Sequence, residues 1–380
     1  MNKVKKFRIK VQKGALTDLK RRLSNVRWPE RETVGGWSQG IPLSYMRELV
    51  DYWRDEYDWN RCQEQLNALP QFMTEIDGLD IHFLHIKSPH KNAMPMVMTH
   101  GWPGSILEFM KVIGPLTDPE AFGGRGEDAF HLVIPTLPGF GWSGKPDQPG
   151  WGIERIGRAW GQLMARLGYK KWVAQGGDWG SAVTHAIGMS ETKHCIAMHT
   201  NMPLLSPSPA LTAEPTEQEI SALAGFQHYF DWDSGYSKEQ STRPQTIGYG
   251  LVDSPVAQCA WIMEKFWCWT DCHGHPENIL SRDELLDNVM MYWLPAAGAS
   301  SARIYWESFS VILAAKPPIH IPVGASVYPH EIFRASKRWC EERYTNLIHY
   351  NTLPKGGHFA AVEQPELFIN EIRTCFRKVR

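Results

Sequence analysis

Apolar and polar positions follow two rhythms along most of the chain. Short, strand-like apolar runs recur from residue 78 onward, and longer segments with apolar residues at helical spacing lie between them. The strand-like runs are GLDIHFLHI, MPMVMTH, FHLVIPTL, KWVAQ, CIAMHT, IHIPVGASVY and NLIHYNTL, and the clearest helical segments are ERIGRAWGQLMARLG and SAVTHAIGM. Because strands that alternate with amphipathic helices form a parallel sheet covered on both faces, the pattern predicts an α/β fold with a mostly parallel central sheet.

Two segments depart from this alternation. Within residues 1–90, ALTDLKRRLSNVRWP has apolar residues at helical spacing and ends at Pro29, and PLSYMRELVDYWRDEY repeats the pattern, which predicts an N-terminal helical meander. Residues 203–315 are rich in Trp, Met, Gly and Pro and predict a largely helical lid inserted between two strands of the sheet. The α/β core is then predicted in two parts, residues 91–202 and residues 316–380.

Composition narrows the class of partner. The chain has 380 residues, 43% of them hydrophobic and 21% charged, and its formal net charge is -1, so no basic field predicts a nucleic-acid partner. The basic start MNKVKKFRIKVQKG has no apolar stretch behind it, and no later run approaches spanning length. We therefore expect a soluble, cytoplasmic protein that acts on a small, weakly charged or neutral molecule, without a membrane partner. A homodimer is compatible with the sequence.

The cysteines predict neither a disulfide framework nor a metal site. There are seven of them, an odd number without paired spacing, as expected for reduced thiols. In CWTDCHGH, four side chains could in principle bind a metal: Cys268, Cys272, His273 and His275. The stretch lacks a second pair of ligands at zinc-site spacing, so an ordinary loop without metal is the better prediction.

A short turn near the middle of the chain carries a candidate nucleophile. The sequence QGGDWG follows the strand-like KWVA and precedes a helical segment. Its glycines, Gly176, Gly177 and Gly180, allow a sharp strand-to-helix turn that lifts Asp178 above the carboxyl edge of the sheet. A carboxylate there can attack an electrophilic carbon and form an ester, although Asp is also a common helix cap. The turn therefore favours alkyl transfer to Asp178, with a structural cap as the alternative.

A second motif is placed to bind an oxyanion. HGWPGS, residues 100–105, directly follows the strand-like VMT, where hydrolases built on a parallel sheet place an oxyanion-hole loop. The second donor in such sites is the N–H of the residue after the nucleophile. The backbone N–H groups of Trp102 and Trp179 are therefore the predicted pair, and a turn rich in Gly and Pro is the alternative.

The C-terminal part of the chain offers a base and its partner. His358 lies in KGGHFAAVEQPELF after the last strand-like run, and a histidine can activate the water that hydrolyses an ester at neutral pH. Glu331, in VGASVYPHEIF, lies between nucleophile and histidine in the chain and could orient the imidazole. Asp253 and Asp271 are weaker alternatives for this acid, and the purpose of His330 stays open.

Taken in order, HGWPGS, QGGDWGS, VYPHE and KGGHFAA resemble the motifs of the microsomal-type epoxide hydrolases, a family of the α/β-hydrolase superfamily. The resemblance extends to FRIKVQKGALTDLKRRL near the N-terminus and to DSPVAQCAWIMEKFWCWT in the lid, and so covers nearly the whole chain. It implies an α/β-hydrolase fold with an inserted helical lid and an N-terminal helical meander. It also implies an enzyme that turns epoxides into diols without a cofactor, for which we expect a role in detoxification. Membrane-bound relatives in the family carry an N-terminal anchor that is not seen in this sequence, so we expect a soluble member.

The resemblance also implies residue roles. Asp178 matches the family's nucleophile, His358 the base that activates water, and Glu331 the acid partner of that base. Two lid tyrosines of the family donate hydrogen bonds to the epoxide oxygen, and they match Tyr236 in SGYSKEQ and Tyr305 in ARIYWES. A phenol with a pKa of about 10 is protonated at neutral pH and fits this role.

Two other functions remain open at this point. A haloalkane dehalogenase shares the aspartate nucleophile, and chloride release would distinguish it from an epoxide hydrolase. A hydrolase-fold receptor could bind a small ligand under the lid without turnover, although an intact set of Asp178, Glu331 and His358 argues against a receptor.

Overall fold

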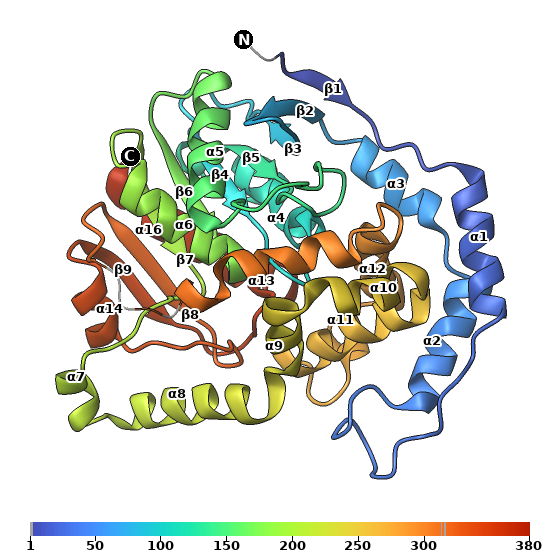
Figure 1. The fold of residues 1–380 in the computed structure, drawn as a ribbon. Coiled ribbons are helices and arrows are strands. Elements are labelled where there is room, and N and C mark those ends of the chain that lie inside the picture. Colours follow the sequence, from blue (N-terminus) through green and yellow to red (C-terminus); the bar gives the residue numbers. More distant parts are fainter. Residues whose placement is uncertain (1–2, 313, 315–316) are drawn as a thin grey trace.

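The centre of the protein is a mixed sheet (Figure 1). The computed structural model describes residues 3–312, 314 and 317–380, and in these residues the sheet has nine strands in the order β1-β2-β3-β5-β4-β6-β7-β8-β9. The strands are β1 (Lys5–Phe7), β2 (Gln71–Ile76), β3 (Leu79–Ile86), β4 (Met94–Thr99), β5 (Phe130–Pro135), β6 (Trp172–Gly176), β7 (Cys195–Thr200), β8 (Val323–Val327) and β9 (Leu347–Thr352).

Neighbouring strands from β4 to β9 run parallel, whereas β1, β2 and β3 pair antiparallel beside β5. The predicted α/β fold with a mostly parallel sheet is therefore confirmed. In β4 and β6, Thr99 lies opposite Gly176 at the ends of the two strands. Because parallel strands end at the same edge of a sheet, the loop after β4 and the turn after β6 meet there.

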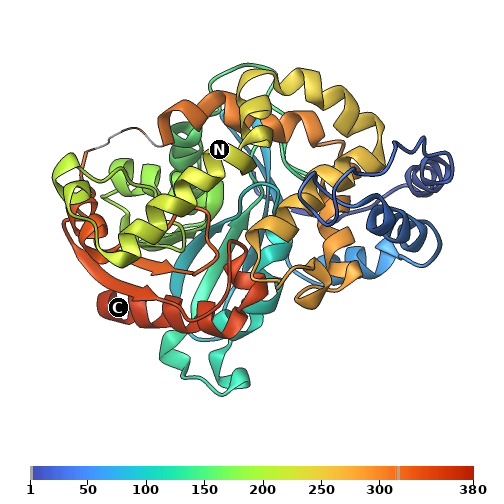
Figure 2. The same cartoon turned by 90° about the horizontal axis from the view of Figure 1, so that it is seen from below.

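Helices cover both faces of the sheet. Figure 2 shows α5 and α6 on one side of the strands and α4 with α16 on the other. Their amphipathic patterns explain this packing: in α5, for example, Ile156, Trp160 and Leu163 recur at helical spacing and are buried. The helices of the core are α4 (Met110–Thr117), α5 (Ile153–Arg166), α6 (Asp178–Ser190), α14 (Lys337–Arg343), α15 (Ala360–Glu363) and α16 (Pro365–Phe376).

The predicted helical lid lies between β7 and β8 in the chain, and its helices gather beside the carboxyl edge of the sheet (Figure 1). They are α7 (Pro209–Ala213), α8 (Glu217–His228), α9 (Gly235–Thr242), α10 (Pro244–Asp253), α11 (Pro255–Trp269), α12 (Arg282–Trp293) and α13 (Gly298–Ile312). Ser254 caps α11, and Ser281 forms a capping box with Glu284 at the start of α12. The predicted boundary between residues 315 and 316 lies outside the described residues.

The N-terminal helices pack on the lid rather than on the sheet. They are α1 (Lys13–Ser24), α2 (Leu43–Asp55) and α3 (Trp59–Asn67), drawn in blue in Figure 1. Arg22 forms an ion pair with Asp253 at the end of α10. Tyr57 and Arg61 both bind the buried carboxylate of Asp287 on α12, at 2.6 and 2.7 Å. The meander therefore fixes the outer side of the lid.

One part of the N-terminal prediction needs correction. The predicted helical meander of residues 1–90 is helical only in α1, α2 and α3, because β1 and β2, which were not predicted, and β3, which is the predicted strand-like run GLDIHFLHI, belong to the central sheet. The edge strand β1 has little apolar patterning, since Lys5 and Lys6 are exposed, and it is recognisable mainly by its pairing with β2.

Two broader expectations can be compared with the structure. Among the described residues, none of the helices combines the length and the apolar character needed to cross a bilayer. All seven cysteines are unpaired, and apart from the half-buried Cys268 they are buried.

Candidate active site

The turn after β6 presents Asp178 in a strained backbone conformation. Its φ angle is +50°, in the left-handed region that residues with a side chain seldom adopt. The chain crosses itself closely here: a Cβ on Gly180 would lie 1.8 Å from the Thr99 carbonyl oxygen, and one on Gly176 would lie 2.1 Å from the Gly180 carbonyl oxygen. Glycine at these two positions therefore permits the turn that carries Asp178 to the first residue of α6.

The loop after β4 contacts the carboxylate of Asp178. The Trp102 backbone N–H donates to Asp178 Oδ1 at 2.6 Å, and a Cβ on Gly101 would lie 1.9 Å from the same oxygen. No hydrogen bond from the Trp179 N–H to Asp178 is present among the described residues. The two predicted oxyanion donors thus differ: the Trp102 N–H already binds the carboxylate, while a contribution from the Trp179 N–H stays a prediction for a reaction intermediate.

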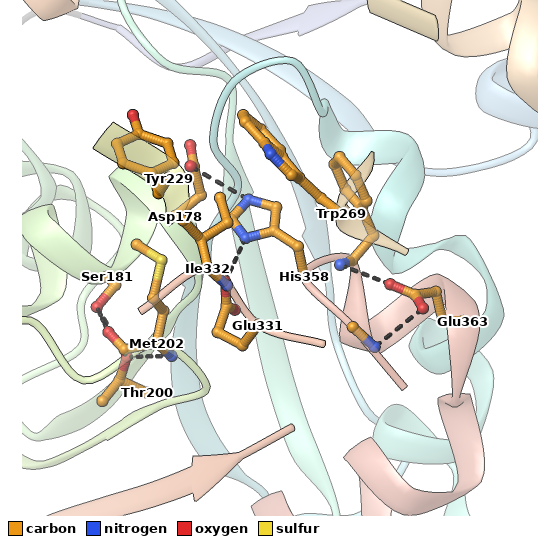
Figure 3. Close-up of polar contacts among 12 residues, drawn as sticks. Asp178, Ser181, Thr200, Met202, Tyr229, Trp269, Glu331, Ile332, His358 and Glu363 are labelled. Carbon is orange, nitrogen blue, oxygen red and sulfur yellow. Dashed lines mark hydrogen bonds and ion pairs between the residues drawn. The ribbon is translucent and has the colours of Figure 1, made fainter. Parts of the chain in front are cut away.

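His358 connects the carboxylate to Glu331 (Figure 3). Its Nε2 lies 3.2 Å from Asp178 Oδ2, and its Nδ1 lies 2.6 Å from Glu331 Oε1, which also accepts the Ile332 N–H at 2.7 Å. The backbone N–H of His358 donates to the Trp269 backbone carbonyl at 2.9 Å, and this bond fixes the histidine loop against the lid. Three residues far apart in sequence therefore meet in the order Asp178, His358, Glu331.

Burial and charge act in opposite directions on the imidazole. The side chains of His358 and Glu331 are 1% and 0% exposed, while that of Asp178 is 15% exposed. Burial opposes protonation of His358, but the charges and hydrogen bonds of Glu331 and Asp178 outweigh burial and raise its pKa well above the ordinary value. His358 is therefore a cation while both carboxylates beside it are charged.

The alternative acids have other roles. Asp271 Oδ2 accepts the Gly356 N–H at 2.9 Å, and its Oδ1 lies 3.1 Å from His330 Nε2. Asp253 is exposed and pairs with Arg22. Neither carboxylate bonds to His358, so Glu331 is the acid partner in this structure. His330, whose purpose the sequence left open, instead pairs with Asp271 beside the histidine loop.

Tyr236 on α9 and Tyr305 on α13 face each other in the lid, with ring centres 5.6 Å apart. The Tyr236 ring stacks on Trp102 at 4.8 Å, and Tyr305 packs edge-on against Trp179 at 4.7 Å. Burial, with a further contribution from the charge of Asp178, raises the pKa of both phenols well above 10. Two protonated hydroxyl groups thus lie close enough to Asp178 to respond to its charge.

The sequence reasoning missed Glu363, which clamps the histidine loop. Its Oε2 accepts the N–H groups of Gly357 and Asp271, and its Oε1 accepts that of Phe359, each at 2.9 Å. Gly357 and Phe359 flank His358, and Asp271 lies just after the lid helix α11. One carboxylate thereby joins the loop to the lid. In the sequence, Glu363 is the glutamate of KGGHFAAVEQ, five residues after His358, and its nearness to this histidine was the available signal.

We expect Glu363→Gln to lower the free energy of unfolding by about 2 kcal/mol, because an amide nitrogen cannot accept an N–H and one buried donor loses its partner. Denaturation in urea, followed by circular dichroism, measures the difference. Glu366→Gln on the exposed side of α16 is the matched control and should change little. Equal stabilities of the two variants would contradict the clamp.

Glu108 is a second carboxyl group near His358 that the sequence reasoning missed. Burial raises its pKa to about 8, against an opposing effect of the His358 charge. Its side chain lies over Gly104, where a Cβ would be 1.5 Å from Glu108 Oε1, and it borders a cavity of about 200 Å³. The short sequence SILEF after the HGWPG motif gives no hint of this burial. At pH 7 Glu108 is therefore mostly neutral, so the charged carboxylates that act on His358 are Asp178 and Glu331.

The metal ligands considered in the sequence are not brought together. Among the described residues, the one group of three potential ligands is Asp233, Glu264 and Cys268, which includes only one residue of the CWTDCHGH stretch. Asp233 and Glu264 already bind the Lys265 ammonium group, at 2.5 and 2.7 Å. A lysine cation thus occupies the place that an ion would need.

Comparison with known proteins gives the same picture along the whole chain. Residues 4–109 match the family model described as the epoxide hydrolase N terminus, and residues 94–244 match the model of the alpha/beta hydrolase fold. Together the two models cover the meander, the first part of the core and the start of the lid. The predicted α/β-hydrolase fold agrees with these matches.

Similar proteins cover nearly the full length. The chain is 54% identical over 374 residues to a protein of Stigmatella aurantiaca provisionally named an epoxide hydrolase, covering 98% of this chain and 85% of that protein. It is 34% identical over 398 residues to epoxide hydrolase 1 of Oryctolagus cuniculus, covering 97% and 88%. The crystal structure of the juvenile hormone epoxide hydrolase from the silkworm Bombyx mori superposes with a TM-score of 0.90 at 30% identity, covering 100% and 95%. The chain therefore belongs to the microsomal-type epoxide hydrolase family of the α/β-hydrolase superfamily.

Proposed function

We propose that this protein converts epoxides to vicinal diols through a covalent ester on Asp178, without a cofactor. One observation carries the proposal: a carboxylate on a strained turn contacts the His358–Glu331 pair, and two buried, protonated phenols, Tyr236 and Tyr305, lie near it. This set contains a nucleophile, a base for water and donors for a departing oxygen, which are the parts that such a reaction needs.

In the first step Asp178 Oδ2 attacks an epoxide carbon. The Trp102 N–H holds Oδ1 where the carbonyl oxygen of the ester would lie, which leaves Oδ2 to form the new bond. The C–O bond of the ring breaks, and its electron pair moves to the ring oxygen. Tyr236 and Tyr305 stabilise this oxygen as donors, because their raised pKa keeps both hydroxyl groups protonated.

The second step depends on a change in His358. Once Asp178 is an ester, it carries no charge, and one of the causes that raise the pKa of His358 is lost. The imidazole can then release its proton and accept one from a water molecule that attacks the ester carbonyl, while Glu331 stabilises the cation that forms. Alkylation thus converts His358 from a charged partner of the nucleophile into a base.

The tyrosines favour this reaction over dehalogenation. A halide leaves as a weakly basic anion and takes no proton, whereas an opened epoxide leaves a basic oxygen that needs donors. Two protonated phenols near Asp178 suit the oxygen. A non-catalytic receptor would have no use for the contact of 3.2 Å between His358 and Asp178. A chloride-release assay and a panel of epoxides would separate the three functions.

The setting of the reaction is part of the proposal. We place the protein in the cytoplasm, where its unpaired cysteines would stay reduced, and assign it the detoxification of small epoxides. Its partners are then the epoxide and water, without nucleic acid or membrane, and a homodimer fits this role as well as a monomer does.

A single turnover in oxygen-18 water, with enzyme in excess over epoxide, should give mostly unlabelled diol. The added oxygen comes from Asp178 Oδ2, and hydrolysis at the ester carbonyl leaves the solvent oxygen on Asp178. Mass spectrometry of the diol and of the peptide that contains Asp178 measures both positions. Asp178→Ala should be inactive. Labelled diol in the first turnover would show that water opens the epoxide directly and would leave Asp178 as a base or a helix cap.

A further inference from the structure

A short series of hydroxyl groups leads away from Tyr236 inside the lid. The Tyr229 hydroxyl lies 3.1 Å from that of Tyr236 and donates to Ser237 Oγ at 3.1 Å. Ser237 Oγ in turn donates to the Ser234 carbonyl at 2.8 Å. Since each hydroxyl has one proton, the Tyr229 oxygen accepts the proton of Tyr236 in the resting protein. The position of Tyr229 comes from a π-helical turn, Tyr229–Asp233, that joins α8 to α9.

A buried cation lies over the same ring. Lys265 Nζ is 4.6 Å from the centre of the Tyr236 ring, and the lysine side chain is 5% exposed. Burial opposes its protonation, but Glu264 and Asp233 outweigh burial and raise the pKa of Lys265, so the ammonium group stays charged. A cation above an aromatic face is attracted to the ring, and in a site of low dielectric it attracts a phenolate far more strongly than a phenol.

Tyr305 has different surroundings. Its ring packs edge-on against Trp102 and Trp179 and lies beside Phe309. In the part of the chain that the structure describes, no lysine or arginine lies over this ring. Burial makes a phenolate at either position costly, and each of the two phenols lies beside the other. Tyr236 differs in having the Lys265 cation over its ring and the Tyr229 hydroxyl at its oxygen.

From this asymmetry we propose that Tyr236 gives its proton to the ring oxygen, that Tyr229 and Lys265 stabilise the phenolate left behind, and that Tyr305 only hydrogen-bonds to that oxygen. The inference rests on the epoxide-opening function proposed above. Tyr229 and Lys265 act through Tyr236 and are positioning residues. Figure 3 shows Tyr229 close to Asp178, on the side of the carboxylate away from Glu363.

The proton balance closes over one turnover. As Asp178 Oδ2 bonds to the epoxide carbon, the ring oxygen takes the Tyr236 proton, and the Tyr229 hydroxyl turns its own proton from Ser237 to the Tyr236 phenolate. The proton that His358 releases after alkylation neutralises the Tyr236 phenolate. The hydrolytic water then supplies two protons. One passes through His358 to the diol oxygen released from the ester, and the other, released as the Asp178 carboxyl ionises, returns His358 to its cationic form.

We expect Tyr229→Phe to slow ester formation about tenfold or more at saturating epoxide, because a donor to an anion is lost. The epoxide concentration at half-saturation should stay the same, since Tyr229 does not touch the substrate. Rapid-quench intact-mass measurement follows ester formation directly. The change keeps the ring and removes only a hydroxyl group. Tyr169→Phe, which removes a hydroxyl bound to His85 at 2.8 Å away from this site, is the matched control and should form the ester at the wild-type rate.

The decisive comparison uses two backgrounds. Tyr229→Phe should slow the Tyr305→Phe enzyme by the same factor as the wild type, but should change the Tyr236→Phe enzyme by less than about twofold, since no phenolate then forms at residue 236. Epoxides with electron-withdrawing substituents, whose opened oxygen needs less proton donation, should be slowed less. Equal slowing in both backgrounds, or no slowing of the wild type, would overturn the assignment. A wild-type enzyme that forms no ester with any epoxide would instead refute the proposed function.

Lys265 is tested separately, since Lys265→Met alone leaves two buried carboxylates without a cation. The double variant Lys265→Met with Asp233→Asn removes one of those charges. Its rate of ester formation should fall about tenfold or more in the wild-type and Tyr305→Phe backgrounds and change little in the Tyr236→Phe background. A rate equal to that of Asp233→Asn alone would remove Lys265 from the proposal.

Discussion

Replacing His358 by alanine should stop the enzyme after a single alkylation. Ester formation needs only the Asp178 carboxylate and the donors to the epoxide oxygen, whereas ester hydrolysis needs a base. Hydrolysis should therefore slow by about a thousandfold or more, and the ester should accumulate. Intact-mass measurement after mixing with an epoxide should show one added substrate mass, and the modified peptide should contain Asp178.

The chain offers a matched control for this variant. His349 also forms a buried pair with a carboxylate, with Nε2 at 2.7 Å from Glu371, and among the described residues no hydrogen bond or ion pair joins it to Asp178. His349→Ala should therefore turn over normally and accumulate no ester, whatever it does to stability. Turnover of His358→Ala at the wild-type rate, without trapped ester, would remove His358 from the mechanism.

The three residues that meet at the turn were predictable because each lies in a short motif. Asp178 follows a strand and precedes a helix among glycines, and His358 and Glu331 follow later strands in the expected order. The carboxyl ends of parallel strands meet at one edge, so their order in the chain nearly fixes their meeting in space. Tyr236 and Tyr305 came from the resemblance alone, since the lid has no such periodic arrangement.

Other parts of the site depend on contacts that no local pattern records. Lys265 pairs with Asp233, 32 residues away, and Glu363 binds the backbone of Asp271, 92 residues away. A sequence shows these carboxylates only as charged residues, and charged residues are usually exposed. The edge strand β1 was missed for a similar reason, because its pairing with β2 across more than sixty residues of sequence, rather than its composition, makes it a strand.

Replacing both Tyr236 and Tyr305 by phenylalanine should nearly abolish ester formation while the fold persists. Each change removes one buried hydroxyl and keeps the ring that packs on Trp102 or Trp179. A single donor of this kind contributes about a hundredfold or more to rate, so the loss of both should leave the alkoxide without protein donors. Rapid-quench intact-mass measurement of ester formation tests this, with thermal unfolding to verify the fold.

Tyr344→Phe is the control for losing a buried phenol in this double variant. Its hydroxyl contacts Nε2 of His185 at 2.6 Å, and His185 lies on α6, the helix that begins at Asp178. Loss of this hydroxyl should leave ester formation intact even if stability falls. Within the pair, the asymmetry around the rings predicts that Tyr236→Phe is slower than Tyr305→Phe, because Tyr236 has the Lys265 cation over its face and the Tyr229 hydroxyl at its oxygen. A double variant that forms the ester at the wild-type rate would mean that the epoxide oxygen finds its proton elsewhere. Glu108, whose pKa of about 8 keeps it mostly protonated at neutral pH, would then be the next donor to remove.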